Sequence, residues 1–279
     1  MRPTLPAVLV SLLGCLISTP MALALDRAAV VVGIDNVKGA PSSVAISGAG
    51  QRAELLGEAL GVAGYGRVEV LSGPAAAQAQ IIGVLDSVLA SLGPQGTLLV
   101  VFEGHGVGGD YGDARLLASE DQVAGSSSDA LDVERLPLRL VKDGQSRHIV
   151  ILTDAVHAGS HSGTLLKGPV ASDWYNPGDR FGTVSSTNAE QVSTPGVFHD
   201  ALIAGLQGDA DADRNATVTY GELVAFLQEE VSALSGGRMQ PARAGGLTDD
   251  LPMAKAIRAP QRVPEACLLY TSPSPRDRG

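Results

Sequence analysis

The stretch Ile149-Val-Ile-Leu-Thr-Asp-Ala-Val-His-Ala-Gly-Ser160 decides the fold of this chain. It begins as a continuous apolar run and ends in a polar turn that contains glycine. A run this apolar is typical of a strand buried on both faces, as in a parallel sheet covered by helices. Such sheets bind ligands in the loops beyond the carboxyl ends of their strands. We therefore expect a functional site between Asp154 and Ser160.

Strand and helix patterns alternate on both sides of this stretch. Apolar runs predict further strands at 27–34, 68–71, 97–102 and 180–186. Apolar residues at helical spacing predict helices at 49–60, 75–92, 131–141, 197–206 and 220–234. A long polar loop is expected at 110–129, and the loop-rich region 236–264 leaves room for one last strand. Alternation with short connections predicts an α/β fold, a doubly wound, mostly parallel sheet with helices on both faces.

The two ends of the chain differ from the segment between them. Residues 1–24 combine a basic start, a short apolar run and an Ala-Leu-Ala ending, which predicts a cleaved signal peptide and a secreted or periplasmic protein. The run is too short to span a bilayer. A lipoprotein cleavage box at 12–15 is the alternative, which Leu13 fits poorly. Residues 265–279 share no pattern with the rest and predict a non-native tail, so we expect a single domain over 25–264.

Composition narrows the functions open to that domain. The net charge of −10 argues against nucleic acid or an anionic membrane as its partner. The two cysteines are Cys15 and Cys267, one in each predicted end segment, so the domain has neither a disulfide nor a catalytic thiol. We expect a peptide or protein partner, while no pattern sets the oligomeric state. Trp174 and Tyr175, which we expect to be exposed in a loop, are candidate contacts for a partner.

Two histidines follow predicted strands. His105 lies between two glycines directly after the strand at 97–102, and His157 follows the strand that begins at Ile149. If these strands are neighbours, both imidazoles face the same edge of the sheet. Imidazole titrates near neutral pH and is the usual general base of enzymes. Spacing alone equally allows both histidines to be solvated loop residues.

The two histidine segments resemble the motifs of caspase-like and bacterial-type metacaspase-like cysteine peptidases. Phe102-Glu-Gly-His-Gly106 is similar to their Ser-Gly-His-Gly motif, and Thr153-Asp-Ala-Val-His-Ala-Gly-Ser160 to their Asp-Ser/Ala-Cys-His-Ser-Gly motif. The likeness extends to Gly33-Ile-Asp-Asn36, the acidic loop near Asp211 and Gln240-Pro241. It therefore covers nearly the whole mature chain in the right order and implies a caspase-like domain.

The matched positions show a departure at the nucleophile. His105 matches the base of the family, and Val156 matches its cysteine nucleophile. The family mechanism needs a thiolate activated by the histidine, and a valine side chain has no lone pair. In a serine protease, loss of the nucleophile costs about a million-fold in turnover. The resemblance therefore implies a pseudopeptidase with a degenerate dyad, in which Asp154 and His157 flank the altered position.

A second departure concerns substrate binding. The Leu-x-x-Ala-x-x-Asp-Ala pattern of the family aligns with 46–53, so Arg52 stands where metacaspase-like members place a carboxylate that binds a basic substrate side chain. The reversed charge turns an attraction of up to about 4 kcal/mol, at 4 Å and an effective dielectric of 20, into a repulsion of similar size. A one-residue slip in the alignment would place Asp35 or Glu54 in that role instead.

A third departure is Glu103, which replaces the serine of the family's histidine motif. A carboxylate beside His105 should favour the imidazolium over the neutral base. The changes at Arg52, Glu103 and Val156 all predict a caspase-like module without peptidase activity, which binds or regulates a peptide or protein.

Two alternatives retain a hydrolase at the same edge of the sheet. Ser160 or Ser162 is a possible nucleophile, although each would need a repositioned histidine and oxyanion hole. A metal-assisted hydrolase is the other alternative, because zinc accepts the ligand types of Asp154, His157, His161 and His105.

The acidic loop at 211–222 predicts a cation site. Its spacing matches the twelve-residue EF-hand loop, with candidate ligands Asp211, Asp213, Asn215, Thr217 through its carbonyl, Thr219 and Glu222. Ala216 stands where that loop normally has glycine, which should weaken affinity. Calcium at a weak site is therefore the expected cofactor. The alternative is an acidic turn in which Thr219 caps the following helix.

Overall fold

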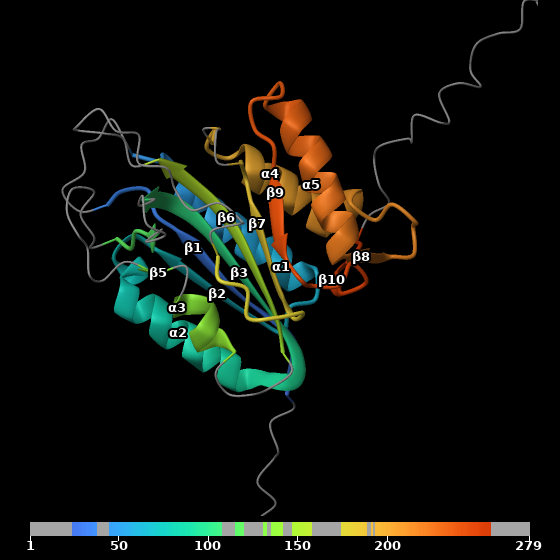
Figure 1. Ribbon diagram of the computed structural model, residues 1–279, viewed down its shortest axis with the longest axis horizontal. Coiled ribbons are helices and arrows are strands. Elements are labelled where there is room, and N and C mark those ends of the chain that lie inside the picture. The colour runs from blue at the N-terminus through green and yellow to red at the C-terminus, as the bar shows by residue number, and fades with distance from the viewer. Residues whose placement is uncertain are drawn as a thin grey trace, which may run out of the picture.

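The computed structural model describes residues 24–37, 45–107, 115–119, 131–132, 135–141, 147–157, 174–188, 191 and 193–257. For Val107, Val156 and His157 it describes the backbone only. An eight-stranded sheet lies at the centre of these residues, with helices on both of its faces (Figure 1). The predicted α/β class with a mostly parallel sheet is confirmed.

The main sheet has the strand order β2-β1-β3-β6-β7-β9. The strands are β1 Leu25–Gly33, β2 Arg67–Ser72, β3 Leu92–Val107, β6 His148–His157, β7 Phe181–Ser185 and β9 Ala242–Gly245. All neighbours along this path are parallel except β9, which is antiparallel to β7. Two short strands, β4 Arg115–Leu116 and β5 Leu131–Asp132, continue from the end of β3 in antiparallel pairs. A separate antiparallel pair joins β8 Thr217–Thr219 to β10 Pro252–Lys255.

The helices form two layers. Helices α1 Ala49–Val62, α4 Val197–Ala204 and α5 Tyr220–Leu234 cover one face of the sheet, and α2 Gln78–Ser91 and α3 Arg135–Leu140 cover the other (Figure 1). A 3-10 turn at Gly73–Ala76 precedes α2, and a π-helical turn at Gly205–Asp209 follows α4. The predicted start of the helix at 220–234 and its end are both confirmed.

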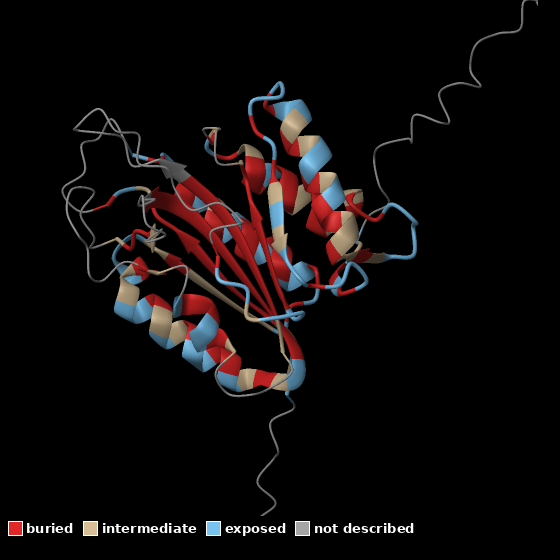
Figure 2. Cartoon of the chain, viewed as in Figure 1, coloured by how far each residue is buried: buried red, intermediate tan, exposed pale blue. Residues whose placement is uncertain are grey.

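Alternation along the strands divides the core between these layers. In β3, Leu99 and Val101 face α1, α4 and α5, whereas Leu98, Val100 and Phe102 face α2 and α3. All five are buried, as is most of the central sheet (Figure 2). Burial of one such side chain stabilises the fold by about 1.5–3 kcal/mol. Because both faces are covered, the central strands are apolar at every position rather than at alternate ones.

The central strands are longer than the sequence predicted. β3 continues to Val107 and β6 to His157, so Glu103, His105 and Asp154 lie within strands and not in the turns after them. The reason is continued pairing, because the parallel register between β3 and β6 runs without interruption to the pair Gly106–His157. The end of β3 also pairs with β4, which lies in the segment predicted to be a loop.

Three further expectations change. The region after α5 holds two strands, β9 and β10, instead of one. Trp174 was expected to be exposed, yet it is 5% exposed and packs in the core beneath α2 and α3, while Tyr175 is exposed. The expected signal peptide, apart from Ala24, the expected tail, and the candidate residues Ser160, His161 and Ser162 lie outside the described residues. Among the helices that the structure describes, none is long and apolar enough to cross a membrane.

Candidate functional site

The carboxyl ends of β3 and β6 bring the motif residues together. The two strands are parallel neighbours, and their register pairs His105 with Val156, Gly106 with His157, and Glu103 with Asp154. The expected proximity of the two histidine segments is therefore confirmed. His105 is fully buried, and its carbonyl accepts a hydrogen bond from the Leu117 N–H at 2.9 Å. The interpretation of His105 as a solvated loop residue is wrong, because the strand continues past it.

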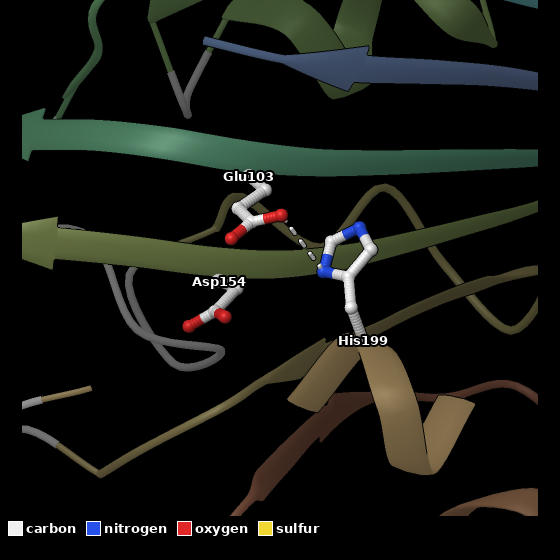
Figure 3. Close-up of side chains that lie close together, drawn as sticks. All are labelled: Glu103, Asp154 and His199. Atoms are coloured by element: carbon white, nitrogen blue, oxygen red, sulfur yellow. Dashed lines mark ion pairs between the residues drawn. The ribbon is translucent and has the colours of Figure 1, made fainter. Parts of the chain in front are cut away.

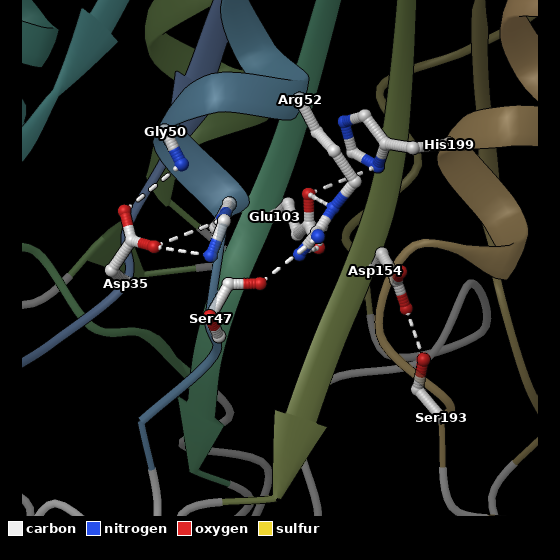
Figure 4. Close-up of polar contacts among 10 residues, drawn as sticks. Asp35, Ser47, Gly50, Arg52, Glu103, Asp154, Ser193 and His199 are labelled. Atoms are coloured by element: carbon white, nitrogen blue, oxygen red, sulfur yellow. Dashed lines mark hydrogen bonds and ion pairs between the residues drawn. The ribbon is translucent and has the colours of Figure 1, made fainter.

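Arg52 and Glu103 form an ion pair at this edge of the sheet. Arg52 reaches from the first turn of α1 across β3, and its Nε donates to both carboxylate oxygens of Glu103, at 2.9 and 3.0 Å (Figure 4). The Nη2 atom also donates to Oε1, and Nη1 donates to the Ser47 carbonyl at 3.0 Å. The Glu103 side chain is fully buried and that of Arg52 is 18% exposed. Such forked, charge-assisted contacts are among the strongest polar contacts in proteins.

The two charges stabilise each other. Hydrogen bonding to Glu103 raises the pKa of Arg52. Burial raises the pKa of Glu103, while the hydrogen bond and the charge of Arg52 lower it. In the sequence, Arg52 and Glu103 are two separate departures from the pattern that the chain resembles, whereas in the structure they form a pair. Their roles toward a substrate and toward the protonation of His105 stay predictions.

Asp154 lies beside Glu103 on the same face of the sheet and is fully buried. The Ser193 hydroxyl donates to its Oδ1 atom, and the Ser186 hydroxyl lies near the same carboxyl group. Its Oδ2 atom has no hydrogen-bond partner among the described residues. Burial raises the pKa of Asp154, and the two serine hydroxyls oppose this increase. The site therefore includes a buried carboxyl group with one oxygen that lacks a hydrogen-bond partner within the described part of the chain.

His199 completes the group, although sequence reasoning missed it. It belongs to the first turn of α4, is fully buried, and places Nδ1 3.3 Å from Glu103 Oε2. That distance would suit an ion pair, but burial lowers the pKa of His199 to about 4, so the imidazole is neutral near pH 7. The sequence signal was a histidine three residues before Leu202 on the apolar face of a predicted helix, a position where a polar residue is unusual.

Asp35 and Glu54, the substitutes allowed by a one-residue slip, lie elsewhere. The Asp35 carboxylate accepts from the N–H groups of Gly48, Ala49 and Gly50 at 2.6, 3.1 and 3.0 Å. It thereby satisfies the free amides at the start of α1, where a negative charge is also favoured by the helix dipole. Glu54 is exposed on α1. Arg52 is thus the α1 residue that faces the Glu103 carboxylate.

A cavity of about 730 Å³ lies at the carboxyl ends of β1 and β2. Its lining includes Asp35, Asn36, Val37, Pro74 and Ala77. It therefore opens at the same edge of the sheet as the Arg52–Glu103 pair, where ligands of parallel sheets generally bind.

The acidic loop has both a cap and a cluster of carboxylates. Thr219 and Glu222 form a reciprocal capping box at the start of α5, so the predicted helix cap is confirmed. Asp211, Asp213 and Glu222 also place carboxylate oxygens within 4.8 Å of one another. Ala216 adopts a left-handed backbone conformation, with φ of 66°, at the position where an EF-hand loop has glycine. The loop therefore has the required sharp turn despite its alanine.

No protein-family model and no curated protein matches this sequence. Solved structures do match. A crystal structure of a protein from Geobacter sulfurreducens has a TM-score of 0.57 and 14% identity, over 83% of this chain and 99% of that one. A structure of pro-Sf-caspase-1 has a TM-score of 0.57 and 15% identity, over 82% of this chain and 90% of that one. This likeness shows a caspase-like fold, and at such low identity it shows the fold alone.

Proposed function

We propose that this protein is an exported caspase-like pseudopeptidase that binds or regulates a peptide or protein. The observation that supports it most is the register of β3 and β6, which sets His105 beside Val156. His105 matches the base in the family resemblance, and Val156 matches the nucleophile. The position next to the base thus has no atom able to attack a carbonyl, and residues 25–264 contain no cysteine to replace it.

The Arg52–Glu103 pair also supports a loss of peptidase function. A pocket for a basic substrate side chain needs an uncompensated carboxylate, and both Glu103 oxygens accept from Arg52. A second guanidinium or ammonium group would have to displace Arg52 or lie beside its positive charge. Both options cost interaction energy, so a basic side chain is a poor ligand at Glu103.

Peptide cleavage is the direct test of the proposal. The purified protein is incubated with a mixed peptide library, with and without added calcium or zinc, and the products are identified by mass spectrometry. We expect no cleavage above that of a His105→Ala variant. Cleavage by the parent protein that disappears in His105→Ala would overturn the proposal and favour the serine- or metal-dependent hydrolase.

The Val156→Cys variant tests whether the rest of the catalytic arrangement survives. We expect it to remain without activity, because Arg52 still neutralises the Glu103 carboxylate. Cleavage by Val156→Cys alone would instead show that the valine is the sole defect. It would then contradict a contribution of the Arg52–Glu103 pair to the loss of activity.

Peptide binding is tested with the immobilised protein and the same library. We expect retained peptides to occupy the cavity beside Asp35, so that Ala77→Trp, which fills its lining, abolishes retention. Ala75→Trp is the matched control, because Ala75 is exposed and not part of the lining. If neither the parent nor the control retains any peptide, an inert structural protein of the envelope is the better interpretation.

We also propose that the loop at 211–222 binds calcium weakly. Three carboxylates within 4.8 Å, a left-handed Ala216 and a helix starting at Tyr220 support this cofactor, because calcium takes oxygen ligands from such a loop. Calorimetric titration of the parent with calcium should show one site that Glu222→Gln removes. Asp250→Asn, an exposed residue outside the loop, should leave it unchanged. Equal calcium binding by parent and Glu222→Gln would refute the site.

A further inference from the structure

Three side chains at the carboxyl edge of the sheet point toward one another from separate elements. Glu103 comes from β3, Asp154 from β6 and His199 from α4 (Figure 3). Each offers one atom to a group in which all atoms lie within 4.8 Å of one another. All three residues are fully buried. Two carboxylates and an imidazole thus converge on one small, buried space.

Several polar atoms of this group lack a hydrogen-bond partner. Among the described residues, neither ring nitrogen of His199 makes a hydrogen bond, and neither does Oδ2 of Asp154. The Nδ1 atom of His199 approaches Glu103 Oε2 at 3.3 Å without hydrogen-bond geometry. Buried polar groups in native proteins are nearly always satisfied, and an ion is one of the recognised explanations for exceptions. A cation among these atoms would satisfy the unmet carboxylate oxygen and one ring nitrogen together.

We infer that Glu103, Asp154 and His199 bind a divalent transition metal, for which zinc is the best match. Zinc accepts one imidazole nitrogen and two carboxylate oxygens, and three protein ligands leave its fourth position open. Calcium and magnesium are poorer matches, because both prefer oxygen ligands alone. This site differs from the zinc set suggested by sequence, with which it shares Asp154 only. It also does not depend on whether the protein cleaves peptides.

Arg52 sets the charge of the site and the position of one ligand. The guanidinium of Arg52 lies against Glu103, so its positive charge offsets that of one of the two carboxylates. Arg52 repels a cation, yet its Nη2 atom donates to Glu103 Oε1 and its Nε atom donates to both oxygens, while Oε2 also lies 3.3 Å from His199 Nδ1. Groups that form hydrogen bonds to a metal-binding side chain in this way fix its orientation. Arg52 therefore fixes the orientation of the Glu103 carboxylate.

The test is zinc binding by the full chain with Cys15 and Cys267 both changed to serine, which removes thiol ligands. Competition with a chromophoric chelator should give a high-affinity zinc site, and cobalt(II) at the same site should give visible absorption bands of a four-coordinate ion. His199→Gln should weaken zinc binding at least about 100-fold and abolish these bands, because loss of a ligand costs no less than loss of a supporting group. Asp154→Asn should do the same while keeping the side-chain shape.

Two control variants separate this site from other metal ligands. Glu222→Gln, in the acidic loop, and His148→Gln, at the opposite end of β6, should both leave zinc affinity unchanged. Circular dichroism verifies that each variant is folded. If His199→Gln does not fold, the zinc affinity of Asp154→Asn provides the test. Zinc affinity that is unchanged in a folded His199→Gln or Asp154→Asn variant would overturn the inference. Displacement of cobalt by calcium would overturn it as well, because it would indicate an all-oxygen site.

Discussion

Within the part of the chain that the structure describes, carboxylates gather at two places, and the two groups are held in opposite ways. In the buried cluster of Arg52, Glu103, Asp154 and His199, the members come from four different elements, and the two members of the ion pair are 51 residues apart in sequence. In the acidic loop, the carboxylates lie within twelve consecutive residues and accept mainly from nearby backbone N–H groups. Asp211 is buried, but Asp213 is exposed.

The difference shows how each group keeps its charges in a folded protein. The buried cluster is shielded from water, so each charge in it depends on a specific partner. Loss of that partner lowers the stability of the fold strongly. The loop uses its own backbone amides and remains partly in contact with water, so no single contact is essential. We therefore expect substitutions in the cluster to change stability much more than substitutions in the loop.

The largest effect is expected from Arg52→Met. The substitution leaves the fully buried Glu103 carboxylate without its cation, and breaking a buried pair in this way costs about 3–5 kcal/mol. Urea unfolding measures the loss. Arg139→Met is the control, because Arg139 pairs with Asp86 and both side chains are about half exposed. It should cost about 1 kcal/mol or less. Similar losses in the two variants would remove the distinction drawn between buried and exposed charges.

The double variant Arg52→Met/Glu103→Leu should recover about 2 kcal/mol or more of that loss. Replacing both partners of a buried pair with apolar groups is often neutral, whereas removing one leaves an uncompensated charge. A double-mutant cycle in urea supplies the coupling energy. If the two single losses simply add, Arg52 and Glu103 do not depend on each other as the distances imply.

In the acidic loop, Thr219→Ala should reduce stability by about 1 kcal/mol. Thr219 accepts from the Glu222 N–H and completes the capping box of α5, and loss of such a cap typically has this cost. Thermal unfolding compares it with Thr219→Ser, which retains the hydroxyl and should stay close to the parent. An equal loss in both variants would assign the effect to the threonine methyl group instead.

The smallest expected effect is an increase in stability. Ala216→Gly should stabilise the protein by about 0.5–1 kcal/mol and tighten calcium binding, because φ of 66° strains alanine but not glycine. Ala212→Gly in the same loop is the control. Ala212 does not have a positive φ, so glycine there adds only chain entropy to the unfolded state and should be slightly destabilising. A destabilising Ala216→Gly would contradict the strain argument.

The sequence predicted most of the fold for an identifiable reason. Apolar runs and helical spacing record burial directly, and this predicted α1, α5 and the parallel arrangement of β1, β3 and β6. The predictions that were wrong concern the ends of two strands and the exposure of one side chain. β3 and β6 extend through glycine and polar residues because each supplies the other's backbone hydrogen bonds, and composition carries no record of such pairing. Trp174 is buried because the core beneath α2 and α3 extends to it.

The two candidate sites also differ in how far the sequence predicted them. The acidic loop is contiguous, so ligand spacing alone identified Asp211, Asp213 and Glu222, and the structure brings their oxygens together. The buried cluster is assembled by the crossing of α1 and α4 over the ends of β3 and β6. Sequence reasoning identified Arg52, Glu103 and Asp154 as notable positions, but not that Arg52 pairs with Glu103, and it missed His199.

By itself, the sequence determined what depends on residue type and local period, namely an α/β fold and a contiguous acidic loop. Only the tertiary structure decided which charges meet. Arg52 satisfies Glu103, and His199 closes the group with Asp154, because helices α1 and α4 pack against the same face of the sheet. Contacts between distant segments arise from packing and backbone pairing, whereas local patterns act over only a few residues.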